Sequence, residues 1–386
     1  MKTRVIQFVT LLFASAATLA VFQPLNAAAA GYEIRPGVVA EFATVRQGRA
    51  ILGARDSFIR AMSPFDRAVR LQTNAAISEA QFLRYIQQQV LPWTAADITT
   101  VTNVLSEFAA RTRDWNLVFP RRFYLVKTTG REEGNAAYLR ESSIILPDLA
   151  LGAGASLGLM AIPAEVARGG RITTGAEFRL YGILSHELFH LYVYQNPKFR
   201  PALYGILGFH PCNDVPLPPW LFERRITDPN PEPHDFFITV QSDGKDVPCV
   251  PVIYSKSTNC TGGGLFDYLV SRLMVLEPAA DGYRPSLLPD GRPRLLSEKE
   301  VAGYFEQIGR NTHYNIHAEE TLADNFSMLV QGAEKVPTPE ILTRLLDVIQ
   351  SGLPATQGRP GAKAPPPPEK TASQAVSSSP TNPLKP

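Results

Sequence analysis

The residues His186–Glu187–Leu188–Phe189–His190 form an H-E-x-x-H motif, and the sequence around them predicts one long helix. A capping box, Thr174-x-x-Glu177, precedes the motif, and Pro197 follows it. Apolar residues recur through the whole segment: Phe178, Tyr181, Leu184, Leu188, Leu191 and Tyr192. We therefore expect the motif in the middle of a helix of about five turns that is buried on most of its faces.

Two histidines four residues apart leave the same face of a helix, so His186 and His190 can bind one metal ion. Glu187 lies beside the first histidine, where it can take a proton from a metal-activated water without binding the metal. Without partners, two histidines and a glutamate would be costly to bury in so apolar a helix. We therefore predict a Zn²⁺ site here rather than ordinary helix histidines.

A catalytic zinc ion usually has three protein ligands and one open position. The best third ligand lies within 317–326, where Glu320 and Asp324 are four residues apart on a predicted helix. We predict that Glu320 binds the metal and that Asp324 accepts the far ring N–H of a ligating histidine. Three other residues compete for the third position: Glu319, His210 and Asp214.

Together, the two motifs resemble those of the gluzincin metallopeptidases, the thermolysin-like superfamily. In that family a second helix carries the ligand Glu and, four residues later, an Asp, as Glu320–Thr321–Leu322–Ala323–Asp324 does here. The string 317–326 is also similar to that of uncharacterised secreted bacterial proteins with this zincin pattern. The resemblance covers two short helices and implies a zinc-dependent peptidase. It also implies a long insertion between the helices, because well-known gluzincins place them much closer together.

Catalysis also needs a donor aimed at the negative charge that develops on the substrate. His313, Tyr314 and His317 immediately precede the Glu320 helix, and we predict Tyr314 and His317 for this role. His317 has an alternative role as the cap of that helix. Three residues of the long insertion could contact a substrate carboxylate or be solvated loop residues: Arg224, Arg225 and His234.

Residues 31–353 are expected to form one α+β domain, mostly helical, with a zincin-like two-lobed fold. A small mixed sheet would lie over the active-site helix in the N-terminal lobe, 31–197. A Pro-rich insertion, 198–263, leads to a helical C-terminal lobe, 264–353, and the substrate cleft would lie between the lobes.

The apolar patterns predict particular elements in these lobes. The predicted helices are Ser78–Val90, Ala95–Thr112, Leu265–Val275, Glu298–Ile308, Ala318–Leu329 and Pro339–Ile349. Arg122–Val126 and Ala136–Leu146 are β-like runs around a turn signal, so we expect them to form a hairpin. Within the mostly loop-like insertion, short strands are expected at Phe236–Val240 and Val250–Tyr254.

Residues 1–30 have the basic start, apolar core and alanine run of a secretory signal peptide, with cleavage expected before Gly31. An uncleaved membrane anchor is the alternative. We therefore predict a secreted or periplasmic protein without stable membrane association after cleavage. Export permits one disulfide among Cys212, Cys249 and Cys260, and the sequence leaves its pairing open. The Pro-rich tail 354–386 is expected to be disordered.

The chain of 386 residues has 38 basic and 36 acidic residues, and two of the basic ones lie in the predicted signal peptide. This balance, without a basic patch, excludes a nucleic-acid partner. The sequence therefore predicts an exported zinc metallopeptidase acting on a peptide or protein substrate, of unknown oligomeric state. A zinc amidase acting on cell-wall peptides and an inactive metal-stabilised binding protein remain as alternatives.

Overall fold

The computed structural model describes residues 31–152, 175–230 and 233–352. The predicted signal peptide, the tail 354–386 and Thr174 of the predicted capping box lie outside the described residues. Helices and two sheets make up the described part of the chain, which confirms the predicted α+β class. No helix within these ranges is long and apolar enough to cross a bilayer.

The N-terminal part contains the predicted mixed sheet, in the order β1-β2-β3-β5-β4. Its strands are β1 (Gly31–Arg35), β2 (Val38–Phe42), β3 (Arg122–Thr128), β4 (Tyr138–Arg140) and β5 (Ser143–Pro147). The pairs β2–β3 and β3–β5 are parallel, while β1–β2 and β4–β5 are antiparallel. β4 therefore forms one edge of this sheet.

Helices cover both faces of the mixed sheet, because side chains alternate along each strand. Phe123 and Leu125 pack with α5 (Ala95–Arg111) and α7 (Gly175–Gln195). Val126 and Ile145 pack on the other face with α1 (Val45–Leu52) and α4 (Glu79–Gln88). The other helices of this half are α2 (Ser57–Ala61), α3 (Pro64–Arg70) and α6 (Asp148–Leu151). The motif helix α7 thus lies against the sheet, as predicted.

The hairpin predicted from the runs on either side of residues 129–135 is wrong, because β3 and β5 run parallel, with Tyr124 opposite Ser143. The antiparallel partner of β5 is β4, and both come from the run that the sequence suggested was one strand. Glu141 separates them, with a φ of 51° in the left-handed region. The β-like run therefore contained a turn at its polar centre, residues 140–143, where the sequence analysis expected one strand to continue.

A second, antiparallel sheet occupies the middle of the chain, in the order β10-β9-β8-β7-β6 with β11 paired to β9. Its strands are β6 (Phe209–Pro211), β7 (Phe236–Ser242), β8 (Lys245–Ser255), β9 (Leu269–Ala279), β10 (Gly282–Pro285) and β11 (Leu295–Leu296). The two strands predicted in the insertion are confirmed but longer than expected. The insertion also contains the short helices α8 (Arg200–Gly205) and α9 (Pro219–Phe222), after a single 3-10 turn at Pro197–Phe199.

Two helices predicted in the C-terminal lobe are wrong. Leu265–Val275 forms a 3-10 turn (Leu265–Tyr268) and then β9, because pairing with β8 satisfies its backbone. A short apolar run is compatible with either a buried strand or a helix. Glu298–Ile308 is helical only as α10 (Tyr304–Ile308), which begins after Gly303 at a φ of 83°. The lobe 264–353 is therefore β-structured first and helical only from α10 onward.

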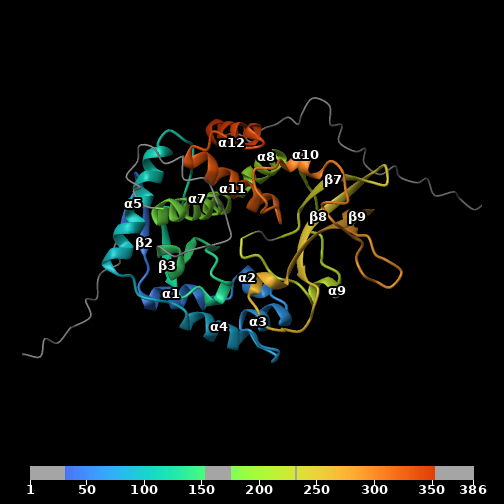
Figure 1. Cartoon of the computed structure of the whole chain (residues 1–386), viewed down its shortest axis with the longest axis horizontal. Helices are drawn as coiled ribbons and strands as arrows, with labels where there is room; N and C mark the ends of the chain where they lie inside the picture. The colour runs from blue at the N-terminus through green and yellow to red at the C-terminus, as the bar shows by residue number, and fades with distance from the viewer. Residues whose placement is uncertain (1–30, 153–174, 231–232, 353–386) are drawn as a thin grey trace, which may run out of the picture.

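The helices predicted in the segments 78–90, 95–112, 318–329 and 339–349 are confirmed as α4, α5, α11 (Ala318–Gln331) and α12 (Pro339–Ser351). Figure 1 shows α7 and α11 side by side at the centre, with β2 and β3 on one side and β7, β8 and β9 on the other. Cys212, Cys249 and Cys260 are all free thiols, so none of the disulfides that the sequence permitted is formed. The fold therefore brings the two motif helices together between the two sheets.

Candidate metal centre

The first two members of the site lie on one face of α7, as their spacing predicts. His186 and His190 are buried, and their ring centroids are 4.8 Å apart. α7 ends at Gln195, where the Asn196 amide donates to the Tyr192 carbonyl at 2.7 Å and Pro197 follows. The apolar residues of α7 belong to the main core, which fixes the direction in which both imidazoles point.

The third member, Glu320, lies in the first turn of α11, which packs along α7. The Ser327 hydroxyl donates to the Gly182 carbonyl at 2.9 Å, which ties the two helices together. A Cβ atom on Gly182 would lie 3.0 Å from the Gln331 amide nitrogen, so glycine permits this close approach. Because the helices are in contact here, Glu320 reaches the histidine face of α7.

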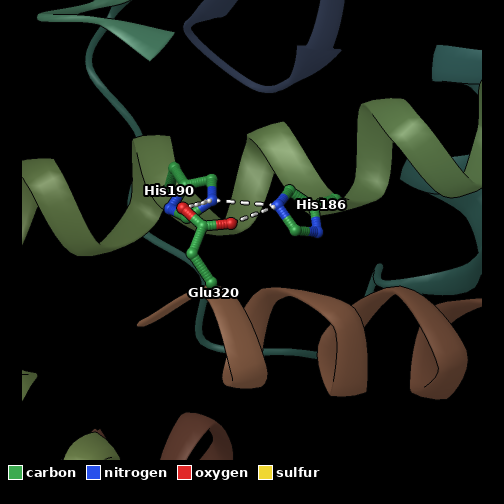
Figure 2. A group of neighbouring side chains, drawn as sticks. All are labelled: His186, His190 and Glu320. Carbon is green, nitrogen blue, oxygen red and sulfur yellow. Dashed lines mark hydrogen bonds and ion pairs between the residues drawn. The ribbon is translucent and has the colours of Figure 1, made fainter. Parts of the chain in front are cut away.

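The Nε2 atoms of both histidines converge on the Glu320 carboxylate (Figure 2). His186 Nε2 lies 3.1 Å from Glu320 Oε2, and His190 Nε2 lies 3.3 Å from Oε1. The two Nε2 atoms are 3.0 Å apart. His186, His190 and Glu320 thus form a buried group that could hold a metal ion.

The opposite ring nitrogens are each held by a second carboxylate. His186 Nδ1 lies 2.9 Å from Asp324 Oδ1, and His190 Nδ1 lies 2.8 Å from Glu319 Oε1. An ionised carboxylate only accepts hydrogen bonds, so each Nδ1 is a donor, and in the neutral histidine, the form that binds a metal, Nε2 then carries the lone pair. Asp324 has the contact that its spacing predicts. Glu319, a competing ligand in the sequence, instead contacts the outer nitrogen of His190.

These outer carboxylates are fixed by hydroxyl groups from elsewhere in the fold. The Thr312 hydroxyl donates to Asp324, and the Tyr204 hydroxyl donates to Glu319. Sequence reasoning missed Thr312 and Tyr204, because nothing in the local pattern links α8 or residue 312 to the motif helix. The one available signal was chemical: two ligating histidines need two acceptors for their outer N–H groups.

The donor set fits a divalent cation. With only the Nδ1 atoms protonated, two ring lone pairs and a carboxylate point at one another away from water. A bound cation or added protons remove the repulsion among these electron-rich atoms. Burial lowers the pKa of His186, but hydrogen bonds with Asp324 and Glu320 outweigh it and raise the pKa to about 10. Burial also raises the pKa of Glu320, yet His190 and His186 hold it well below its usual range. The surroundings therefore favour positive charge at this point.

Glu187 lies beside the group and is 3 % exposed. Its Oε2 atom is buried and has no hydrogen-bond partner among the described residues. Burial raises the pKa of Glu187 to about 7, although His186 and His190 oppose the shift. Together with His186 and Glu320, Glu187 lines a cavity of about 80 Å³. A carboxylate oxygen in this place has the position and the affinity for a proton that a general base requires.

The cavity lies between the two halves of the chain. Its walls are mainly apolar and come from both: Ala136, Ala137, Tyr138 and Ile183 from the N-terminal half, and Ile226, Ile253, Leu265, Phe266, Leu269 and Ile316 from the later half. Tyr314 also lines it, with its ring centroid 6.3 Å from that of His186. Tyr314 is thus near the metal-facing residues, and its role as a donor to the substrate stays a prediction.

His317 occupies a different place. Its Nδ1 accepts the Glu319 backbone N–H at 3.1 Å, which makes it the N-cap of α11. It lines a second cavity together with His234, and it is not among the residues that line the Glu187 cavity. His317 therefore caps α11, which is the alternative role that the sequence analysis gave it. His313 is exposed on the preceding loop.

The other candidates from the insertion lie outside the metal group. His210 is exposed on β6, and Asp214 accepts the His234 backbone N–H at 3.1 Å. The Arg224 guanidinium stacks on Trp220, 4.4 Å from the ring centroid. Arg225 lines the second cavity with His317. Among the described residues, only His186, His190 and Glu320 form a group suited to a metal ion.

Comparison with protein-family models, with curated proteins and with solved structures gives no match to this chain. The metal group is accordingly defined by contacts within the chain itself.

Proposed function

We propose that this chain is an exported zinc-dependent metallopeptidase. One observation carries the proposal: two histidine Nε2 atoms and a carboxylate converge beside a buried glutamate oxygen that has no hydrogen-bond partner among the described residues. The resemblance of the two motifs to those of gluzincins supports the reaction class, and residues 1–30 support export.

In this proposal His186, His190 and Glu320 would hold the zinc ion. A bound zinc ion acts as a Lewis acid that polarises a carbonyl group and lowers the pKa of water toward neutrality. Asp324 and Glu319 keep the two imidazoles in the tautomer that presents Nε2, because each accepts the N–H of the opposite nitrogen. The ligands are thus oriented before any metal arrives.

Glu187 would act as the general base through Oε2, which accepts a proton from the attacking water. The same oxygen would then deliver that proton to the nitrogen of the leaving amine. The Tyr314 hydroxyl would donate a hydrogen bond to the carbonyl oxygen as negative charge develops there. The apolar walls of the cavity would exclude bulk water and strengthen both interactions.

The first test is metal content, measured by mass spectrometry on the purified mature protein. We expect about one zinc ion per chain, lost in both His186→Ala and Glu320→Ala. Zinc that is lost in His186→Ala but retained in Glu320→Ala would reject Glu320 as a ligand. Absence of metal in the wild type, even after zinc is supplied, would reject the hydrolase.

The second test compares the wild type with Glu187→Gln on a fluorogenic peptide library. Because the proposed role of Glu187 is to move a proton and not to bind the metal, Glu187→Gln should retain its zinc and lose activity by about 10²–10⁴-fold. A zinc-loaded wild type that cleaves no peptide would contradict the peptidase assignment. Equal behaviour of both proteins would favour a metal-stabilised binding protein, and cleavage of wall-peptide amides alone would favour an amidase.

A further inference from the structure

We propose that Asn230 is a positioning residue for Glu320. The loop that carries Asn230 is held in place by a buried ion pair in the N-terminal half. This inference rests on the proposed metal centre, since Glu320 is the carboxylate assigned to the metal. Asn230 is far from both motifs in the sequence, and it is not a member of the metal group.

The Asn230 side chain connects the edge of the mixed sheet to Glu320. Its Nδ2 donates to Glu320 Oε1 at 3.1 Å, and its Oδ1 accepts the Leu139 backbone N–H of β4 at 2.9 Å. The Leu139 contact fixes which end of the amide faces Glu320, because a backbone N–H requires the oxygen. The amide therefore presents an N–H to one oxygen of the proposed ligand.

This contact sets the rotation of the Glu320 carboxylate. Asn230 contacts Oε1, whereas His186 Nε2 lies 3.1 Å from Oε2. A carboxylate whose two oxygens have different partners cannot rotate without losing both contacts. Asn230 therefore holds Glu320 in the orientation in which Oε2 faces the His186 ring.

The loop that carries Asn230 is itself anchored to α3. Asp66 accepts the Thr227 backbone N–H at 2.9 Å, and Arg70 donates to the Thr227 carbonyl at 2.9 Å. The side chains of Asp66 and Arg70 are fully buried and pair with each other. Next to Asn230, the Asp228 carboxylate accepts the Asn230 backbone N–H at 3.0 Å. Residues 227–230 are thus anchored to α3 at Thr227 and to β4 through the Asn230 side chain, and the Asp228 contact holds the turn between these two points.

The test is the Zn²⁺ affinity of Asn230→Asp, measured by competition with a chromophoric chelator. The substitution keeps an oxygen for Leu139 but replaces the donor at Glu320 with a second oxygen. We expect Zn²⁺ binding to weaken by about 10–100-fold, the usual effect of removing a hydrogen-bond partner from a metal ligand. The visible absorption spectrum of the Co²⁺-loaded protein should change as well, since a misplaced carboxylate alters the coordination of the metal.

Asn74→Asp is the matched control. Like Asn230, Asn74 uses both ends of its amide: its Oδ1 accepts the Cys260 backbone N–H at 2.6 Å and its Nδ2 donates to the Cys260 carbonyl at 2.7 Å, and neither Asn74 nor Cys260 belongs to the metal group. We expect Asn74→Asp to keep its Zn²⁺ affinity within about twofold of the wild type, because the same chemical change there leaves Glu320 untouched. A merely structural role of Asn230 would not distinguish the two variants in this way.

If circular dichroism shows that Asn230→Asp is unfolded, Asn230→Ala is measured by the same criterion. Its Zn²⁺ affinity should fall and its Co²⁺ spectrum should change in the same way, because this substitution also removes the donor at Glu320. A folded Asn230 variant with wild-type affinity and an unchanged Co²⁺ spectrum would overturn the inference. A zinc-loaded wild type that cleaves no peptide would reject only the peptidase, since affinity alone decides the role of Asn230.

Discussion

Two buried polar clusters lie on either side of the cavity, and they differ in the source of their positive charge. The Arg70 cluster consists of Arg70, Asp66 and Glu133. The guanidinium contacts Glu133 Oε2 and Oε1 at 2.8 and 2.6 Å, pairs with Asp66 and donates to the Thr227 carbonyl. A permanent cation from the chain itself therefore satisfies both carboxylates.

The metal cluster consists of His186, His190 and Glu320 with the outer carboxylates Glu319 and Asp324. It is buried to a similar degree but contains no arginine or lysine, and its Nε2 atoms converge on a carboxylate. Its positive charge must come from protons or from an ion. A cluster with its own cation can hold the fold together, whereas a cluster that lacks a resident cation is suited to bind one.

The largest effect should come from breaking the self-sufficient cluster. Arg70→Met would leave Asp66 and Glu133 buried without their cation, and it should lower the free energy of unfolding by about 3–5 kcal/mol in urea denaturation. The matched control is Arg55→Met, whose ion pair with Glu79 is solvent-exposed, at 64 % for the arginine side chain. That control should lose less than about 1 kcal/mol. Recovery of wild-type stability in Arg70→Met on adding zinc would contradict the difference between the clusters.

The second effect concerns Glu132, a buried carboxylate beside the Arg70 cluster that has no cation of its own. It is 1 % exposed, and neither oxygen has a hydrogen-bond partner in the described parts of the chain. Burial raises the pKa of Glu132 from 4.5 to about 7. Because the pKa is raised in the folded state, folding favours the protonated form of Glu132. The contribution of this group to the free energy of unfolding is therefore fully present below about pH 4.5 and is lost as the pH rises through 7.

Glu132→Gln should therefore match the wild type near pH 4.5 and exceed its free energy of unfolding by about 3 kcal/mol above pH 8. Parallel urea titrations of both proteins across this range measure the difference, and other titrating groups cancel in it. A difference that does not change with pH would show that Glu132 is solvated or paired in solution.

The third and smallest effect sharpens the comparison at the metal cluster. Free zinc at 100 times its dissociation constant should raise the free energy of unfolding of the wild type by about 2.7 kcal/mol, provided that the unfolded chain does not bind it. Glu320→Ala should show no such gain, and Glu319→Gln a reduced one, because Glu319 reaches the metal group only through the outer nitrogen of His190. An equal gain in all three proteins would place the zinc elsewhere.

The residues of the site that lie on the two long helices could be predicted from the sequence. His186, Glu187 and His190 follow from one motif, and Glu320 with Asp324 from another, because residues four apart on a helix share a face. Glu319, which the sequence left as a competitor of Glu320, contacts the outer nitrogen of His190 instead, and Tyr204, Thr312 and Asn230 were missed. These last three lie on a short helix and two loops, whose positions depend on the packing of distant elements.

The fold shows the same division. The capped helices α4 and α5 were predictable, since each begins with a Ser or Thr whose side chain accepts the N–H three residues later. The run 265–275 was not, because its apolar pattern suits a helix and a buried strand alike. Its conformation is decided by β8, which provides the backbone partners. The turn at Glu141 lies in the polar centre of a run that otherwise suits a strand, and it is the pairing of β4 with β5 that shows the chain reverses there.

Local periodicity was enough to tell which residues share a helix face. It therefore also showed that two imidazoles, the Glu187 carboxylate and two carboxylates of a second helix could meet at one metal ion. Only the tertiary structure decided which nitrogen of each histidine faces inward, which carboxylate holds the outer one, and which loop reaches Glu320. The physical reason is one of range. Helix periodicity and capping act within a few residues, whereas Asp324, Glu319 and Asn230 find their partners only when α7, α11 and the 227–230 loop pack together.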